Sequence, residues 1–181
     1  MAVAMHAVRS VSSPSSNDIA IVPLRADQWQ DLKRLRVTAL TESPDSFSPT
    51  AASARAHDDA YWQRGAQRAA ESTDFEMFIV RRDGHGMGLG SAGRDEQGVG
   101  HIGAMWVDPS LRGHGVGARL FDTCVEFLKS RGCASIELSV TETNAPAIAL
   151  YQSRGFVLTG TFEPLREGSP LKNLYMKWER R

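Results

Sequence analysis

The sequence has little cysteine, and this scarcity excludes two classes of small protein. Among its 181 residues only Cys124 and Cys133 are cysteines, and neither belongs to a CxxC or HxxxH pattern. Two cysteines are too few for a disulfide-rich scaffold. Because neither lies in a zinc-ligand motif, they do not indicate a zinc site. We therefore expect a cytoplasmic protein with reduced thiols and no bound metal.

An excess of one charge and a long apolar run are also missing. Basic and acidic side chains each number 21, so the formal net charge is zero. A general nucleic-acid binder normally shows a basic excess, so we expect no nucleic-acid partner. No apolar run approaches the ~18 residues of a membrane-spanning helix, so we expect no membrane partner.

Length and composition suit one domain behind a short tail. Residues 1–18 are rich in serine and lack the continuous apolar segment of a signal peptide, which predicts a disordered N-terminal tail. The whole chain is 41% hydrophobic, enough for a single core. Domains commonly contain ~100–200 residues, so we expect one domain over residues 19–181.

The first part of the chain predicts one strand followed by helices. An apolar run over residues 19–24 predicts the strand, and Asp27 is expected to cap the next segment, where apolar residues recur at helical spacing up to Leu40. Two prolines mark a loop over residues 41–49. A second helix is expected over residues 58–67 and a polar loop over residues 69–74.

The rest of the chain predicts a mixed sheet. Three strands, over residues 75–82, 87–94 and 99–107, are separated by short turns, and such neighbours are antiparallel. A helix from Val116, ended by Gly132, leads to a strand over residues 135–140, which requires a parallel crossover. A helix capped by Asn144 and two last strands follow. This order predicts an α+β fold with a mostly antiparallel sheet, one parallel strand pair and helices on both faces.

A glycine-rich stretch joins the third of these strands to its following helix. Gly113, Gly115 and Gly117 alternate behind Arg112. Glycine lets the backbone approach a ligand closely and adopts a positive φ at little cost. The first N–H groups of a helix have no internal partner, and the helix dipole makes that end positive. The stretch therefore predicts a phosphate-binding loop.

Two familiar phosphate motifs fit this stretch poorly. Gly113-x-Gly115-x-x-Ala118 matches a dinucleotide fingerprint, but Pro109 and Arg112 precede the glycines, where that turn is tight. The antiparallel strands also come first, which is the wrong order for a doubly wound sheet. A Walker A loop is excluded because no Lys-Ser or Lys-Thr pair follows the glycines.

Two separate motifs occur here in an order that is typical of one family. Residues 112–117, Arg-Gly-His-Gly-Val-Gly, fit the signature R/Q-x-x-G-x-G/A. Further on, Asn144, Ala149-Leu150-Tyr151 and Arg154-Gly155-Phe156 fit the segment N…A-x-x-L-Y-x-x-x-G-F. The chain thus resembles the GCN5-related N-acetyltransferases (GNAT family) over roughly residues 99–165. The resemblance implies a GNAT-like fold whose two parallel strands splay apart.

The resemblance also implies acetyl-CoA as the acetyl donor. The pantetheine arm would enter between the splayed strands and pair with main-chain groups near Val107, and the pyrophosphate would lie on the amides after Arg112. Arg112 would either brace this loop or contact the phosphate, and His114 would face solvent or a CoA phosphate. The expected donor-binding residues are Met105, Trp106, Val107, Arg112, Gly113, His114, Gly115, Val116, Gly117, Ala118, Asn144, Tyr151 and Ser153.

Acetyl transfer to an amine needs a base and an acid, because an alkyl ammonium has a pKa near ~10.4 and the departing thiolate needs a proton. Tyr151 is the expected acid, since related enzymes often place a tyrosine here near the CoA sulfur. His101 is the expected base, because it stands eleven residues before Arg112, where histone-type members carry their catalytic glutamate. Glu137, Glu142 and a water chain are rival bases.

We therefore expect a direct N-acetyltransferase that uses acetyl-CoA and a primary amine of a small molecule or of a peptide or protein. The alternative from another class is a non-catalytic module that binds or senses acyl-CoA. The loops expected on the acceptor side have a mixed composition, so they select no particular amine. Exposed strand edges would allow a homodimer, but no residue pattern specifies one.

Overall fold

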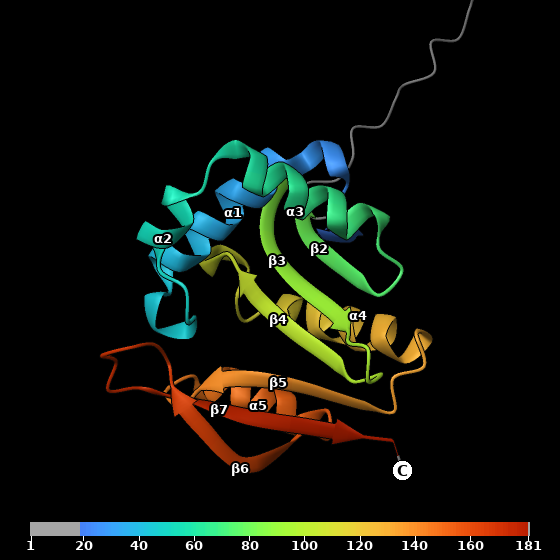
Figure 1. Ribbon diagram of the computed structural model, residues 1–181, viewed down its shortest axis with the longest axis vertical. Helices are drawn as coiled ribbons and strands as arrows, with labels where there is room; N and C mark the ends of the chain where they lie inside the picture. Colours follow the sequence, from blue (N-terminus) through green and yellow to red (C-terminus); the bar gives the residue numbers. More distant parts are fainter. Residues whose placement is uncertain (1–18, 181) are drawn as a thin grey trace, which may run out of the picture.

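The seven strands of the described residues belong to one sheet, with the order β1-β2-β3-β4-β5-β7-β6 (Figure 1). The structure is a computed structural model that describes residues 19–180, so the predicted tail lies outside the described residues. Only β4 and β5 pair in parallel, and every other neighbouring pair is antiparallel. The predicted α+β fold with one parallel strand pair is confirmed.

The elements follow one another with short connections. The strands are β1 (Ile19–Pro23), β2 (Phe75–Arg82), β3 (His85–Arg94), β4 (Gly100–Val107), β5 (Ser135–Thr141), β6 (Val157–Pro164) and β7 (Lys172–Glu179). The helices are α1 (Trp29–Glu42), α2 (Ala51–Ala56), α3 (Asp59–Glu71), α4 (Val116–Ser130) and α5 (Ala145–Ser153). The short 3-10 turns are η1 (Ala26–Gln28), η2 (Pro44–Ser46) and η3 (Pro109–Leu111).

Helices cover both faces of the sheet, and each face has its own core. Successive side chains of a strand point to opposite faces, so Phe78 and Val80 of β2 join the core beneath α4 and α5. Met77 and Ile79, between and beside them, join the core beneath α1, α2 and α3. Figure 1 shows these two helix layers on either side of the strands.

Two local predictions for the first half are wrong, and one helix was missed. Asp27 does not cap α1; it lies in η1, where its carboxylate accepts hydrogen bonds from Arg25, and Gln28 occupies the N-cap position. The predicted polar loop from residue 69 is helical up to Glu71, because Ala69 is only 1% exposed and packs in the core. Helix α2 was not predicted at all, since six residues are too few to show a helical period.

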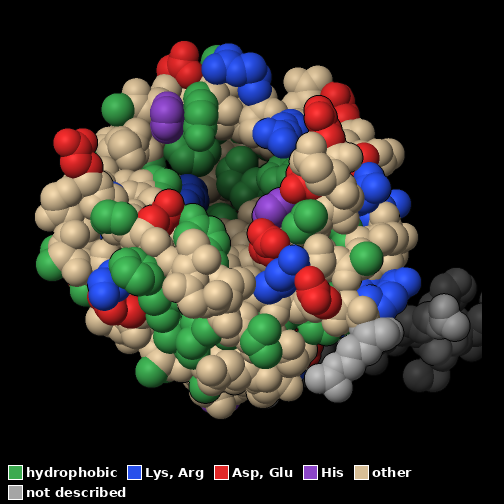
Figure 2. Space-filling model, turned by 60° about the horizontal axis from the view of Figure 1, so that its bottom comes forward, with side chains coloured by type: hydrophobic (Ala, Val, Ile, Leu, Met, Phe, Trp, Pro, Cys, Tyr) green, Lys and Arg blue, Asp and Glu red, His purple; other side chains and the backbone are tan. Residues whose placement is uncertain are grey.

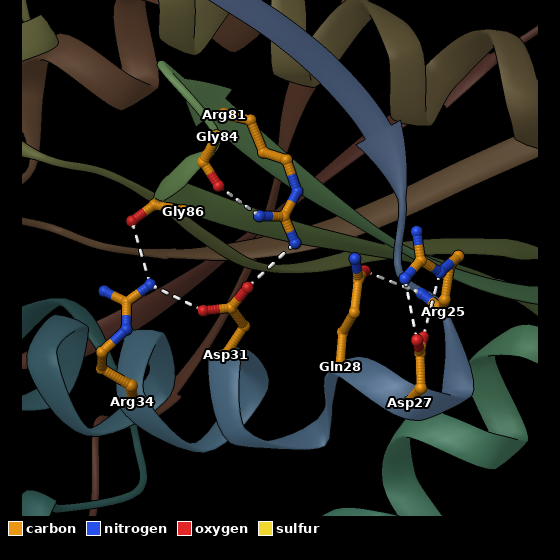
Figure 3. A network of polar contacts seen from close by, with 8 residues as sticks. All are labelled: Arg25, Asp27, Gln28, Asp31, Arg34, Arg81, Gly84 and Gly86. Atoms are coloured by element: carbon orange, nitrogen blue, oxygen red, sulfur yellow. Dashed lines mark hydrogen bonds and ion pairs between the residues drawn. The ribbon is translucent and has the colours of Figure 1, made fainter.

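An ion-pair network holds α1 against the hairpin of β2 and β3 (Figure 3). The Asp31 carboxylate accepts hydrogen bonds from Arg34 and from Arg81, each at 2.9 Å. The same two arginines donate to the carbonyls of Gly86 and Gly84, at 3.2 and 2.8 Å. Burial by itself would raise the pKa of Asp31, but the two arginines outweigh it and lower that pKa. The network fixes one side of α1 and leaves its other side to pack against α2 and α3.

Candidate active site

The strands β4 and β5 are paired over a short length only. Their parallel register runs from Gly100 opposite Ile136 to Ile102 opposite Leu138, where it ends. Just beyond, the register between β3 and β4 shifts, and Ala104 adopts a left-handed φ of 54°. A bulge of this kind bends a strand. The strands therefore open after Ile102, and the predicted splay is confirmed.

A cavity of about 190 Å³ lies in this opening. Met105 of β4 and Tyr151 of α5 line it, and Asn144 at the start of α5 lies beside them. Asn173 of β7 also lines it although only 7% exposed, and the sequence pattern gave no reason to select this residue. The loop of residues 46–49 closes the side toward α1. Figure 2 shows a hollow in this side of the molecule, with hydrophobic side chains inside and charged ones around it.

Tyr151 brings a phenol to the wall of this cavity. Its side chain is 7% exposed and packs on Phe121, with ring centroids 4.7 Å apart. Burial raises the pKa of Tyr151 to about 12, because the charged phenolate would lose its hydration. The hydroxyl therefore keeps its proton at neutral pH.

The loop between η3 and α4 presents a row of backbone N–H groups. Gly113 and Gly115 have left-handed φ values of 78° and 75°, and Gly115 forms the N-cap of α4. Within residues 19–180, no N–H group from Gly113 to Ala118 donates to another protein group. Free amides at the positive end of a 15-residue helix form a site for an anion.

The Arg112 side chain faces away from this row and holds the loop in place. Its Nε donates to the Val107 carbonyl at 3.0 Å, and its two terminal nitrogens donate to the Glu42 carboxylate at 3.1 and 2.6 Å. The Trp106 indole donates to the same carboxylate at 2.9 Å. The Arg112 hydrogen bonds are the main reason that the pKa of Glu42 falls to about 2. Of the two roles that the sequence left open for Arg112, the geometry supports bracing.

His101 lies at the start of β4 on the face opposite Ile102. Its Nε2 is 2.7 Å from the Asp95 carboxylate, and half of its side chain is exposed. The hydrogen bond from His101 lowers the pKa of Asp95. Glu137 is the register partner of His101 on β5, and its carboxylate lies 3.7 Å from Lys177 Nζ. None of these side chains lines the cavity that holds Tyr151.

The other predicted site residues have partners of their own. Glu142 accepts a hydrogen bond from the Lys172 amide at 2.9 Å. The His114 ring is 2.9 Å from the Arg112 carbonyl and is exposed. Ser153 donates to the Leu150 carbonyl at 2.6 Å. The Oδ1 atom of Asn144 caps α5, which leaves its amide nitrogen unengaged by the described residues.

Neither a cluster of metal-ligand side chains nor a membrane-spanning helix occurs among the described residues. Between Ile19 and Arg180, no three or more His, Cys, Asp or Glu side chains come together as metal ligands would. No helix in the same range is both long and apolar enough to cross a membrane.

Comparison with known proteins places this geometry in a family. Residues 32–156 match the model of the acetyltransferase (GNAT) family. An acetyltransferase of the GNAT family from Streptococcus pneumoniae has the same fold, with a TM-score of 0.76 and 18% identity over 90% of this chain and 100% of that one. The Salmonella typhimurium protein yncA, solved with its cofactor acetyl-CoA, has a TM-score of 0.74 and 16% identity over 90% of this chain and 94% of that one.

A protein found by sequence similarity is also named as an acetyltransferase. A mycothiol acetyltransferase from Brachybacterium faecium is 32% identical over 157 residues, which cover 80% of this chain but 47% of the relative. The chain thus spans about half the length of this relative. Since the family model covers well over half of the chain and the two motifs of the resemblance lie on the loop before α4 and on α5, the chain belongs to the acetyltransferase (GNAT) family.

Proposed function

We propose that the chain is an N-acetyltransferase, with residues 19–181 as its single catalytic domain, and that it transfers an acetyl group from acetyl-CoA directly to a primary amine. The observation that carries this proposal is the gap between β4 and β5, with Tyr151 on its wall and free amides in the loop that follows β4. The similar protein from Brachybacterium faecium is named as an acetyltransferase, which supports transfer of an acetyl group. The similar protein yncA was solved with acetyl-CoA, which supports acetyl-CoA as the donor.

The residues at this gap fit the parts of the donor. Past Ile102, the main chain of β4 at Met105, Trp106 and Val107 has lost its partner on β5, so it can pair with the amides of a pantetheine arm as an added strand would. The amides of Gly113 to Ala118 suit a pyrophosphate. Asn144 and Ser153 would lie along the arm. Bound acetyl-CoA would supply the activated acetyl group.

Two proton transfers fall to the side chains. Tyr151 holds its proton at neutral pH because its pKa is raised to about 12, so it can protonate the departing sulfur. His101 is the base that we favour, because Asp95 orients its imidazole. Since His101 does not line the cavity of Tyr151, a water molecule would relay the proton from the amine to it. Glu137, Glu142 and a water chain stay as rival bases. The Arg112–Glu42 pair would hold the loop and α1 in register around the donor.

Steady-state release of free CoA thiol, measured over a panel of primary amines, tests this proposal. Thiol release that requires the amine supports direct transfer. Tight acetyl-CoA binding with no turnover on any amine would favour the alternative, a non-catalytic acyl-CoA module. Absence of acetyl-CoA binding in calorimetry would contradict both.

The cellular compartment and the oligomeric state of the chain are separate proposals. Both cysteines are buried free thiols, which suits a cytoplasmic protein. A homodimer would use the exposed β6 edge, where Val157 and Phe162 are 63% and 56% exposed. Light scattering after size exclusion decides between monomer and dimer. A monomer at micromolar concentration would refute the proposed homodimer.

A further inference from the structure

A second and larger cavity, of about 460 Å³, lies among α1, α2, α3 and β2. Its apolar lining includes Leu32, Trp62, Phe75 and Met77. Ligand pockets for small molecules commonly have volumes of ~300–1,000 Å³ and such a lining. The cavity therefore has the size and the surface of a site for a small organic molecule.

The charges in this lining are all of one sign. Three arginines, Arg36, Arg64 and Arg68, line the cavity, and no aspartate or glutamate does. Over residues 19–180 none of these three arginines forms an ion pair or a side-chain hydrogen bond. In contrast, Arg34 and Arg81 both form ion pairs with Asp31 (Figure 3). Because the chain as a whole has zero net charge, this local excess is a property of the cavity.

Two donors of the lining are buried and unsatisfied. Arg36 Nη1 and Trp62 Nε1 have no hydrogen-bond partner among the described residues. Burial lowers the pKa of Arg36, but a guanidinium keeps its charge at neutral pH. A buried donor without a partner costs roughly 1–3 kcal/mol, and a charged one costs more. An acceptor atom on a ligand would remove part of that cost.

Arg36 also connects this cavity to the opening between β4 and β5. Arg36 and Pro49 line both cavities. The Arg36 guanidinium lies over the Phe47 ring, 4.8 Å from its centroid, and Phe47 lines the smaller cavity beside Tyr151. A molecule held at Arg36 in the larger cavity is thus next to the proposed transfer site.

We propose that the larger cavity binds the acceptor, and that this acceptor is an amine with an anionic group, a carboxylate or a phosphate, on an apolar body. The proposal rests on the acetyltransferase function proposed above and narrows its substrate class. The planar guanidinium of Arg36 matches either anion with two parallel hydrogen bonds. The same three arginines repel polycations, so polyamines are disfavoured acceptors.

Matched amines with and without an anion provide the test. Thiol release from acetyl-CoA is measured with phenylalanine against phenethylamine, with O-phosphotyramine against tyramine, and with spermidine. We expect kcat/KM to be higher for the anionic member of at least one pair, on the order of tenfold or more, as for one charge-assisted hydrogen-bond pair. The two pairs distinguish a carboxylate from a phosphate. A preference for the neutral amines or for spermidine would overturn the proposal.

Substitutions at Arg36 test whether this residue causes the preference for anionic amines. Arg36→Gln should raise KM for the anionic amine on the order of tenfold to a hundredfold, with a small change for its neutral partner, and Arg36→Lys should retain part of the preference. Arg55→Gln is the matched control, because exposed Arg55 lies on α2 outside the cavity and donates only to Thr41. An equal loss in Arg55→Gln, or an undiminished preference in Arg36→Gln, would overturn the assignment.

Binding of an unreactive anion separates this proposal from the acetyltransferase function. Calorimetry with 3-phenylpropionate, which has no amine, should show binding to the wild-type protein and weaker binding to Arg36→Gln. Such binding without acetylation of any amine would refute the transferase function, and the proposal that the larger cavity binds an anion would stand. Acetylation without preference for anions, together with no binding of 3-phenylpropionate, would refute the anion site alone.

Discussion

Glu42, the last residue of α1, holds Arg112 in the loop before α4 through both of its carboxylate oxygens, with N···O distances of 3.1 and 2.6 Å. The two residues are 70 positions apart in the chain. The pair joins the helix layer beside the larger cavity to the loop with the free amides. It therefore links the proposed acceptor side to the proposed donor side.

The pair makes stability depend on pH. The pKa of Glu42 is about 2 in the folded protein against an ordinary value of 4.5, so its contribution is complete above about pH 5 and is lost as the pH falls toward 2. We expect Glu42→Gln to lower the free energy of unfolding at pH 7 by at most about 1 kcal/mol, because both side chains are partly exposed. Urea unfolding between pH 7 and pH 3 measures this difference.

Asp45→Asn is the control for this prediction. Asp45 makes a longer ion pair, 3.3 Å, with Arg166, and its side chain is 69% exposed. Its replacement should leave the unfolding free energy nearly unchanged over the whole pH range. A difference between the wild-type protein and Glu42→Gln that does not shrink on acidification would contradict the role of the Glu42 charge.

Gly115→Ala should reduce both stability and donor binding. Gly115 has a φ of 75° and an added Cβ would meet no atom within 4 Å, so the cost is conformational and amounts to ~1–2 kcal/mol. The strain would also displace the free amides at the start of α4. Chemical unfolding and acetyl-CoA calorimetry should both show the loss.

Gly117→Ala is the matched substitution inside α4, where an added Cβ also meets open space but φ is not left-handed. The family signature admits alanine at this position. We therefore expect unchanged or slightly higher stability and retained acetyl-CoA binding. Equal losses in both alanine variants would show that φ is not the cause.

Tyr151→Phe should lower kcat on the order of a hundredfold, the usual contribution of a positioned acid, with little change in acetyl-CoA affinity. Because the pKa of Tyr151 is about 12, ionisation of this residue should not produce an alkaline fall in the rate below about pH 10. The pH profile of kcat and calorimetry with acetyl-CoA check both statements. Tyr175→Phe is the control, since Tyr175 does not line the cavity of Tyr151. Unchanged turnover in Tyr151→Phe would exclude it as the acid.

His101→Gln should lower kcat/KM at neutral pH on the order of a hundredfold. Asp95→Asn should have a smaller effect, because Asp95 acts through its hydrogen bond to His101. Glu137→Gln and Glu142→Gln test the two rivals under the same conditions. If neither His101→Gln nor the glutamate variants lower kcat/KM, a water chain is the base.

Local patterns were sufficient to predict much of the fold and the proposed donor loop. The apolar run in residues 75–82, the short turns after them and the glycines before α4 act over a few residues, so the sequence alone predicts β2, the antiparallel neighbours and a phosphate-binding loop. Asn144 was predicted as a cap and does cap α5, because capping depends on a residue and the amides just after it.

Only the tertiary structure shows which distant residues meet. Nothing near Glu42 in the chain indicates its ion pair with Arg112, and nothing near Arg36 indicates that it shares a cavity with Trp62 and Phe75. Both arrangements arise when α1 packs across the sheet and against α3. The same packing leaves the Arg36 donor without a partner and creates the larger cavity. The proposed donor loop is thus determined by residues that are close in sequence, whereas the proposed acceptor cavity exists only where separate helices and strands come together.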